Sequence, residues 1–210
     1  MIITEIKKIG RGDRYSLYCD DAFFMQIETE ILVKNKLKIG QQLSEEDCQK
    51  LKLQNGDYAS FDKALTYLEK GIKTEKGTRD YLKKKGYLDE SIDKAIEKLK
   101  DYGYIDDEVF AESYINTYSH LKGKQKLKYE LLSKGVDKEI IDQKLEDLID
   151  EDEQIENAKT LGKKYLKNKA VDEKTYQKLC AHLVSKGFSF DVVSKVAKEV
   201  LKEKKDESRN

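Results

Sequence analysis

Residues 111–136 read AESYINTYSHLKGKQKLKYELLSKGV, and this stretch decides the fold because its pattern occurs three times in the chain. The first part is an alanine followed three positions later by an aromatic or apolar residue. It returns at an offset of 47 residues each time: Ala64 and Tyr67, Ala111 and Tyr114, Ala158 and Leu161. The second part is a leucine followed by a Lys-Gly pair: Leu82 and Gly86, Leu131 and Gly135, Leu183 and Gly187. A period near this length predicts a tandem array of small units, which favours binding over catalysis.

Within each unit, the spacing of apolar residues predicts three helices. We expect the first helices at 60–71, 107–120 and 151–167, the second at 74–85, 123–134 and 172–186, and the third at 89–101, 137–149 and 189–204. Gly86, Gly135 and Gly187 should end the second helices, because glycine adopts the left-handed backbone that a helix C-cap needs. The lysine beside each glycine suits the negative end of the helix.

The composition agrees with helices that are exposed to solvent over most of their surface. Charged residues make up 39% of the chain, apolar residues make up 38%, and proline is absent. The net charge is zero and the apolar spacing is regular, which argues against disorder. Residues 151–210 carry fourteen basic and eleven acidic side chains. A dedicated DNA-binding protein usually has a larger basic excess, so we expect nucleic acid not to be the only partner.

The cysteines and the N-terminus predict a cytoplasmic protein. Cys19, Cys48 and Cys180 lie far apart, which argues against both a disulfide framework and a zinc site. The first residues carry charge where a signal peptide would be apolar, and no apolar run approaches the length of a membrane span. We therefore expect no membrane partner.

Residues 1–36 differ from the rest of the chain and predict a small antiparallel sheet followed by a short helix at 28–36. Three alternating runs suggest the strands, and Asp20-Asp21 suggests a turn between the last two. Ser44 and Asp47 have the spacing of a capping box that opens a helix. We expect Asn55-Gly56-Asp57 to end that helix with a C-cap glycine. The chain then divides into an extension at 1–58, repeats at 59–105, 106–150 and 151–205, and a frayed tail at 206–210.

The junction at 102–107, Tyr-Gly-Tyr-Ile-Asp-Asp, has the residues that a tight connection between helices requires. Gly103 should end one helix, Tyr104 and Ile105 should pack back, and Asp106 should cap the next helix. The alternative is a catalytic or metal-binding pair formed by Asp106 and Asp107. No histidine or third carboxylate lies at a suitable spacing, so we expect no metal and no cofactor.

The segment 122–128, Lys-Gly-Lys-Gln-Lys-Leu-Lys, is the densest basic feature. One interpretation is a solvated helix face. The other is an anion-binding helix N-terminus, where Gly123 allows close approach and free amides point outward. Repeat 1 has a similar basic run, from Lys73 through Arg79 to Lys83-Lys84-Lys85.

The other candidate sites are weaker. The chain has 13 tyrosines, many of them in the first two repeats, and we expect core packing more than a platform for stacking bases. His120 and His182 have no partner at ligand spacing, and the chain contains no phosphate-binding loop or hydrolase motif.

Three segments resemble the RecX regulatory proteins: 102–114 (YGYIDDEVFAESY), 79–87 (RDYLKKKGY) and the region 122–136. The resemblance covers about 60–205, and the N-terminal strands are similar to an extension found in some members. It implies a mainly α fold of three tandem three-helix repeats in an elongated, curved array. The structural signature would be Gly86, Gly103, Tyr104, Asp106, Asp107, Phe110, Ala111 and Gly135.

The resemblance also implies a function. A protein of this family would bind the RecA recombinase filament on single-stranded DNA, block filament growth and lower recombinase and ATPase activity. It would thereby modulate recombination, DNA repair and the SOS response. The ATPase is the partner's, and we expect this chain to be a monomer and not an enzyme. The contacts to partner or DNA are predicted at Arg79, Lys83, Lys84, Lys124, Lys126 and Lys128.

Two other functions are weighed against this one. Two helices joined by a glycine turn are also typical of helix-turn-helix units, so the chain could be a DNA-binding module that acts without recombinase. A hydrolase that uses Asp106 and Asp107 is the third hypothesis.

Overall fold

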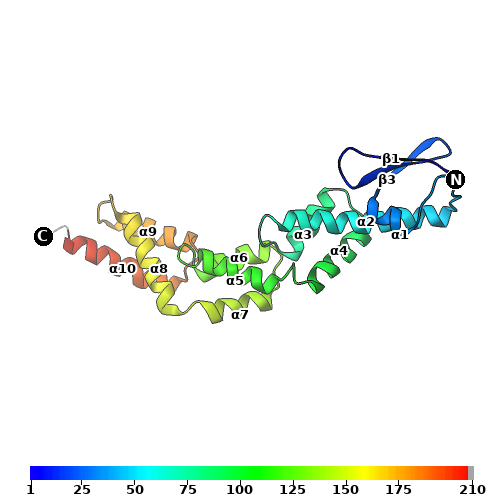
Figure 1. Ribbon diagram of the computed structural model, residues 1–210. Coiled ribbons are helices and arrows are strands. Elements are labelled where there is room, and N and C mark those ends of the chain that lie inside the picture. The colour runs from blue at the N-terminus through cyan, green and yellow to red at the C-terminus, as the bar shows by residue number, and fades with distance from the viewer. Residues whose placement is uncertain (208–210) are drawn as a thin grey trace. The chain divides into compact units, whose positions relative to one another are not determined.

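The computed structural model describes residues 1–207, with side chains to residue 206 (Figure 1). The chain divides into two compact units, one formed by residues 1–105 and one that begins at Asp106. The predicted mainly α architecture with an N-terminal antiparallel sheet is confirmed. No helix in the described part of the chain is both long and apolar enough to cross a membrane.

The first unit begins with the predicted sheet. Strands β1 (Ile3–Lys8), β2 (Arg14–Cys19) and β3 (Ala22–Glu28) pair antiparallel in chain order. The turn between β2 and β3 is made by Asp20 and Asp21, whose φ angles of 48° and 60° match the right-handed twist of a hairpin. One face of the sheet packs on α1 (Thr29–Lys34) and on the start of α2 (Glu45–Leu68), and the apolar core there contains Ile3, Leu17, Ile27, Cys48 and Leu51.

Helix α2 begins at the predicted cap, because Ser44 and Asp47 form a capping box. Its predicted end at Asn55-Gly56-Asp57 is wrong, since α2 runs without a break through these residues to Leu68. Contacts on both sides explain the difference. The Asn55 side chain accepts a hydrogen bond from the backbone of Glu28 at 2.8 Å, and a Cβ on Gly56 would lie 3.0 Å from Oγ of Ser91. Gly56 therefore allows the helix that contains Ser91 to approach α2 closely, and it does not end α2. The predicted boundary between the extension and repeat 1, at residues 58 and 59, falls inside α2.

The C-terminal half of α2 forms repeat 1 with α3 (Glu75–Lys84) and α4 (Asp89–Asp101). Its core contains Ala64, Leu82, Ile92, Ile96 and Leu99. Ile105 also packs there, with 4% of its surface exposed, but the predicted inward packing of Tyr104 is wrong because 56% of that residue is exposed. The backbone N–H of Tyr104 donates to Leu99, which closes the turn at Gly103 and leaves the ring in solvent.

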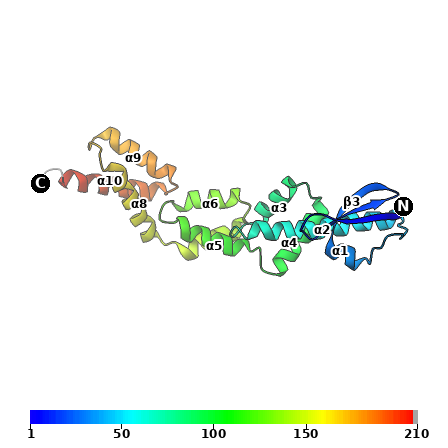
Figure 2. The same ribbon diagram turned by 45° about the horizontal axis from the view of Figure 1, so that its top comes forward.

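The second unit contains repeats 2 and 3. Repeat 2 consists of α5 (Asp107–Tyr118), α6 (Lys124–Ser133) and α7 (Lys138–Leu148), and repeat 3 of α8 (Glu151–Leu166), α9 (Glu173–Ser185) and α10 (Phe190–Glu207). Each repeat has its own apolar core, and Figure 2 shows α5 and α6 lying beside one another. Helix α10 extends beyond the predicted 204, so residues 206 and 207 of the predicted frayed tail are helical, and residues 208–210 lie outside the described chain.

The three Lys-Gly turns are confirmed. Gly86, Gly135 and Gly187 have φ angles of 86°, 86° and 90°, in the region that favours glycine. In each case the residue after the glycine donates its N–H to the leucine five positions before it, which satisfies a carbonyl at the helix end.

Candidate partner interface

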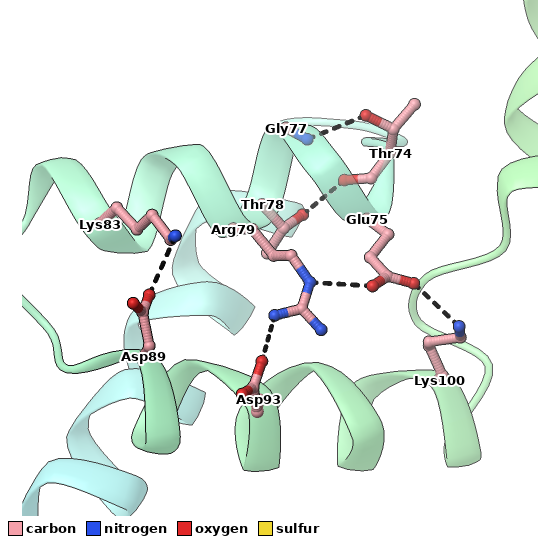
Figure 3. A network of polar contacts seen from close by, with 9 residues as sticks. All are labelled: Thr74, Glu75, Gly77, Thr78, Arg79, Lys83, Asp89, Asp93 and Lys100. Carbon is pink, nitrogen blue, oxygen red and sulfur yellow. Dashed lines mark hydrogen bonds and ion pairs between the residues drawn. The ribbon is translucent and has the colours of Figure 1, made fainter. Parts of the chain in front are cut away.

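The start of α3 is fixed by Thr74, the N-cap residue. Its hydroxyl oxygen accepts a hydrogen bond from the backbone of Gly77 at 3.0 Å, and its carbonyl accepts one from the hydroxyl of Thr78 at 3.0 Å (Figure 3). This cap fixes the start of α3, and Glu75 and Arg79, one turn apart, lie on the side of the helix that faces α4.

Arg79, a predicted contact residue, joins α3 to α4 (Figure 3). Its Nε donates to Glu75 at 2.8 Å and its Nη1 to Asp93 at 2.5 Å, while Lys100 donates to the other oxygen of Glu75 at 2.8 Å. Burial alone would lower the pKa of Arg79, but the bonds to Asp93 and Glu75 raise it. The hydrogen bond from Lys100 lowers the pKa of Glu75, against an opposing effect of burial and with help from Arg79. Arg79 is therefore held charged and serves to position the two helices.

The neighbouring lysines of repeat 1 differ from one another. Lys83 forms an ion pair with Asp89 at 3.0 Å (Figure 3). Lys84 is exposed and has no acidic partner in the part of the chain that the structure describes. Of the three predicted contact residues in this repeat, Lys84 is the one whose charge is open to a partner.

The lysines of repeat 2 also differ in whether their ammonium groups are bonded within the chain. Lys128 is ion-paired with Asp142, and Nζ of Lys126 donates to the carbonyl of Ser185 at 3.2 Å. The ammonium group of Lys124 has no acidic partner within residues 1–207 and is half-buried. Like Lys84 in repeat 1, Lys124 is therefore the predicted contact residue of this segment whose charge has no acidic partner among the described residues.

Of the two interpretations of the segment 122–128, the anion site with free amides at the start of α6 is wrong. The N–H of Gly123 donates to Lys186 at 2.9 Å, that of Lys124 to the side chain of Gln154 at 3.1 Å, and that of Gln125 to Gly187 at 3.2 Å. The carbonyl groups at the C-terminal end of α9 thus accept hydrogen bonds from N–H groups at the N-terminal end of α6. The negative end of one helix dipole therefore lies against the positive end of the other. A Cβ on Gly123 would lie 2.2 Å from the Gly187 oxygen, so glycine is needed for contact with another part of the chain.

Asp106 has the predicted structural role. Its carboxylate accepts hydrogen bonds from the backbone of Glu108 at 2.8 Å and of Val109 at 3.0 Å, which caps α5. Within the described residues, no group of three or more histidine, cysteine or acidic side chains is placed to hold a metal ion. In the same junction, Ala111 is fully buried and Phe110 packs against the core of repeat 2.

The structure also groups aromatic and lysine side chains that the sequence interpretation left apart. In repeat 2 the hydroxyl of Tyr114 donates to Glu130 at 2.7 Å, and Lys122 donates to the same carboxylate at 2.6 Å. In repeat 3, Tyr165 stacks on His182 with ring centroids 4.6 Å apart. The 47-residue offset was the signal for this group, since it aligns Tyr165 with Tyr118 and Lys169 with Lys122.

Comparison with known proteins agrees with this architecture. Residues 61–99, 106–145 and 151–197 match the first, second and third three-helix domains of RecX. The regulatory protein RecX of Clostridium beijerinckii is 38% identical over 206 residues, which cover 96% of this chain and 95% of that protein. The regulatory protein RecX of Bacillus licheniformis is 36% identical, covering 94% of this chain and 76% of the relative.

Two solved structures are also similar. A crystal structure of a regulatory protein RecX has a TM-score of 0.70 and 26% identity, and the match covers 94% of this chain and 98% of the other. The crystal structure of RecX from Lactobacillus salivarius has a TM-score of 0.63 and 30% identity over 69% of this chain and 96% of the other. The chain therefore belongs to the non-enzymatic RecX family of regulatory proteins.

Proposed function

We propose that this protein binds the RecA recombinase filament on single-stranded DNA and slows RecA's ATP hydrolysis and filament growth. It would thereby modulate recombination, DNA repair and the SOS response in the cytoplasm. The observation that carries the proposal is membership of the RecX family through all three of its helical domains. Balanced charge also supports it, because a nucleoprotein filament presents both protein and phosphate surfaces.

The open cations are the residues proposed to contact the filament. Lys84 and Lys124 have no acidic partner among the described residues, so contact with phosphate or a carboxylate would not require an internal ion pair to break. Arg79, Lys83 and Lys128 are already paired within the chain. We assign them a secondary role, in which they shape the surface around the open lysines.

The test is a titration of the protein into a reaction of RecA, single-stranded DNA and ATP, in which ATP turnover and filament length are followed. We expect both to fall as the protein is added. The double variant Lys84→Ala/Lys124→Ala should inhibit at a concentration about tenfold higher, since each lost charged contact costs about 0.5–1 kcal/mol. The matched control is Lys50→Ala/Lys198→Ala, which removes two exposed lysines elsewhere, one in each unit.

A salt series with DNA alone separates this proposal from a DNA-binding module that acts without recombinase. Such a module should bind DNA tightly, with a steep loss of affinity as salt rises. Tight binding to naked DNA together with unchanged RecA turnover would refute the proposed function.

A further inference from the structure

In each repeat, an aromatic side chain of the first helix lies beside one lysine, and a second lysine lies over an aromatic ring in repeats 1 and 2 and acts on His182 through its charge in repeat 3. One lysine lies between the first and second helices, and the other precedes the glycine that ends the second helix. We call each group an aromatic–lysine site. The residues are Tyr67, Tyr81, Lys73 and Lys85 in repeat 1; Tyr114, Tyr118, Glu130, Lys122 and Lys134 in repeat 2; Tyr165, His182, Lys169 and Lys186 in repeat 3.

Repeat 2 shows which chemical group such a site holds. The carboxylate of Glu130 accepts from the hydroxyl of Tyr114 at 2.7 Å and from Nζ of Lys122 at 2.6 Å. Lys122 also lies over the ring of Tyr118, 4.1 Å from its centroid. Burial alone would raise the pKa of Glu130, but the bonds from Lys122 and Tyr114 hold it below its usual value. The aromatic–lysine site of repeat 2 therefore stabilises an anion that lies between a lysine and an aromatic side chain.

Repeat 1 lacks this internal anion. The position of Glu130, one residue before the buried leucine, is occupied by Tyr81, which stacks on Tyr67 with centroids 4.2 Å apart and planes 8° from parallel. Lys73 and Lys85 lie over these two rings, each 5.6 Å from a centroid. Neither lysine forms an ion pair with an acidic residue of the described chain.

Repeat 3 also lacks the anion, because His182 stands at the position of Glu130. Its ring stacks on Tyr165, and Nζ of Lys169 lies 2.9 Å from the Tyr165 centroid. Burial lowers the pKa of His182, and the positive charges of Lys186 and Lys169 lower it further. The segment 163–186 around this group carries seven lysines and two acidic residues.

We propose that the aromatic–lysine sites of repeats 1 and 3 each bind a phosphate group of single-stranded nucleic acid, while Glu130 closes the corresponding site of repeat 2. Paired cations beside aromatic rings are what proteins use to hold single strands, since the cations contact phosphates and the rings contact bases. Two open sites in one chain suit a polymeric anion, which offers many phosphate groups. The inference rests on the proposed function in one respect, because it names residues through which the chain would touch the DNA of the filament.

The site in repeat 3 also predicts a direction for pH dependence. The charges that face His182 are Lys169, beyond the end of α8, and Lys186, at the end of α9. From α10, Lys204 donates to the carbonyl of Leu166 at the end of α8. A bound phosphate would oppose these positive charges and raise the pKa of His182, so binding would take up a proton. Affinity should therefore rise as the pH falls through the pKa that His182 has in the complex.

The direct test gives repeat 3 the internal anion of repeat 2. In the full-length chain, His182→Glu should weaken binding of a fluorescein-labelled oligothymidylate about tenfold and lower the salt slope by about one. The measurement is fluorescence anisotropy without RecA. The matched control is Gln177→Glu, which adds the same charge at an exposed position of the same helix. The reverse change, Glu130→Gln, should strengthen binding because it opens the site of repeat 2.

Two further variants keep the inference testable if His182→Glu unfolds, which circular dichroism would detect. Lys169→Gln should weaken binding as His182→Glu does, and His182→Gln should remove the rise in affinity at low pH. Equal affinities for His182→Glu and Gln177→Glu in folded protein would overturn the proposal. So would equally tight binding of polyglutamate with the same dependence on these variants, which would indicate an acidic protein partner. RecA inhibition is measured separately, so DNA affinity that none of these variants changes, together with inhibition that persists, would refute the phosphate sites and leave the proposed function standing.

Discussion

At the scale of single residues, three glycines set the geometry of the repeats. Gly86, Gly135 and Gly187 all take φ angles near 90°, where an L residue is strained. The strain is greatest for a β-branched side chain, whose Cβ carries two further heavy atoms. Glycine is required at these positions because the left-handed backbone lets the chain leave the helix while the last helical carbonyls still accept hydrogen bonds.

We predict that Gly135→Val destabilises the second unit by about 2 kcal/mol, because valine resists the left-handed conformation. Thermal unfolding should show a lower midpoint. Gly12→Val is the control, since Gly12 has open space around it and does not have a positive φ. An unchanged midpoint for Gly135→Val would contradict the assigned role of the turn.

Glu75 gives a prediction about pH. The hydrogen bond from Lys100 holds its pKa below the usual value, with burial opposing and Arg79 assisting. Its ionised form therefore stabilises the fold above the unfolded pKa, and this stability is lost as the pH falls through the folded pKa. We expect Glu75→Gln to cost roughly 1 kcal/mol at neutral pH, and the difference from the parent protein to shrink below about pH 4.

Denaturant unfolding at several pH values measures this difference. Glu97→Gln makes the same change on an exposed part of α4 and should have little effect. A cost for Glu75→Gln that does not depend on pH would show that its contacts with Lys100 and Arg79 do not stabilise the fold through charge.

At the scale of helices, the contact between α9 and α6 joins repeats 2 and 3. Backbone bonds from Gly123 and Gln125 to the end of α9 leave no space for a side chain on Gly123. The two repeats therefore meet through main chain, where any added atom forces the helices apart.

We predict that Gly123→Ala separates the two helix ends, because its Cβ would lie 2.2 Å from the Gly187 oxygen. Hydrogen exchange should become faster at the amides of Gln125 and of residue 123, and the second unit should lose about 2–3 kcal/mol of stability. Gly77→Ala is the control, because its Cβ would meet only the hydroxyl of Thr74, at 3.1 Å, and alanine favours a helix. Unchanged exchange at both amides would show that the contact is dispensable.

These elements also show how far the sequence determines the structure. The bounds of α3 to α10 follow closely from apolar spacing and caps, because those signals are local. The sequence does not reveal the roles of Gly56 and Gly123, because these glycines are required by tertiary contacts: Gly56 lies against Ser91 and Gly123 against Gly187. The six predicted contact residues cannot be sorted into paired and open ones from the sequence, since Asp89, Asp93 and Asp142, which pair with three of them, lie on other helices.

At the scale of the whole molecule, the chain consists of two compact units, and the boundary between them in the sequence falls between Ile105 and Asp106. Ile105 is buried in the core of repeat 1, while Asp106 caps the first helix of the second unit. Each unit thus contains its own core and closes its own helix ends. The elongated, curved array stays a prediction from the repeats.

We predict that fragments 1–105 and 106–210 fold separately, because the apolar clusters of each unit are formed by its own residues. Each should unfold cooperatively when followed by circular dichroism. Inhibition of RecA should nevertheless weaken by about 10²–10⁴-fold when the two fragments are mixed, if both units contact the filament, because cutting the chain removes the effective concentration that one contact gives the other.

The inhibition measured with the two fragments shows which unit makes each proposed contact with the filament. A fragment that inhibits as strongly as the intact chain would show that its partner unit does not touch the filament, which would exclude either Lys84, in the first unit, or Lys124, in the second. Equal weakness of both fragments would fit a molecule whose affinity comes from several modest contacts spread over its repeats. Balanced charge favours this second outcome, because neither unit has a large excess of basic over acidic side chains with which to bind a filament tightly alone.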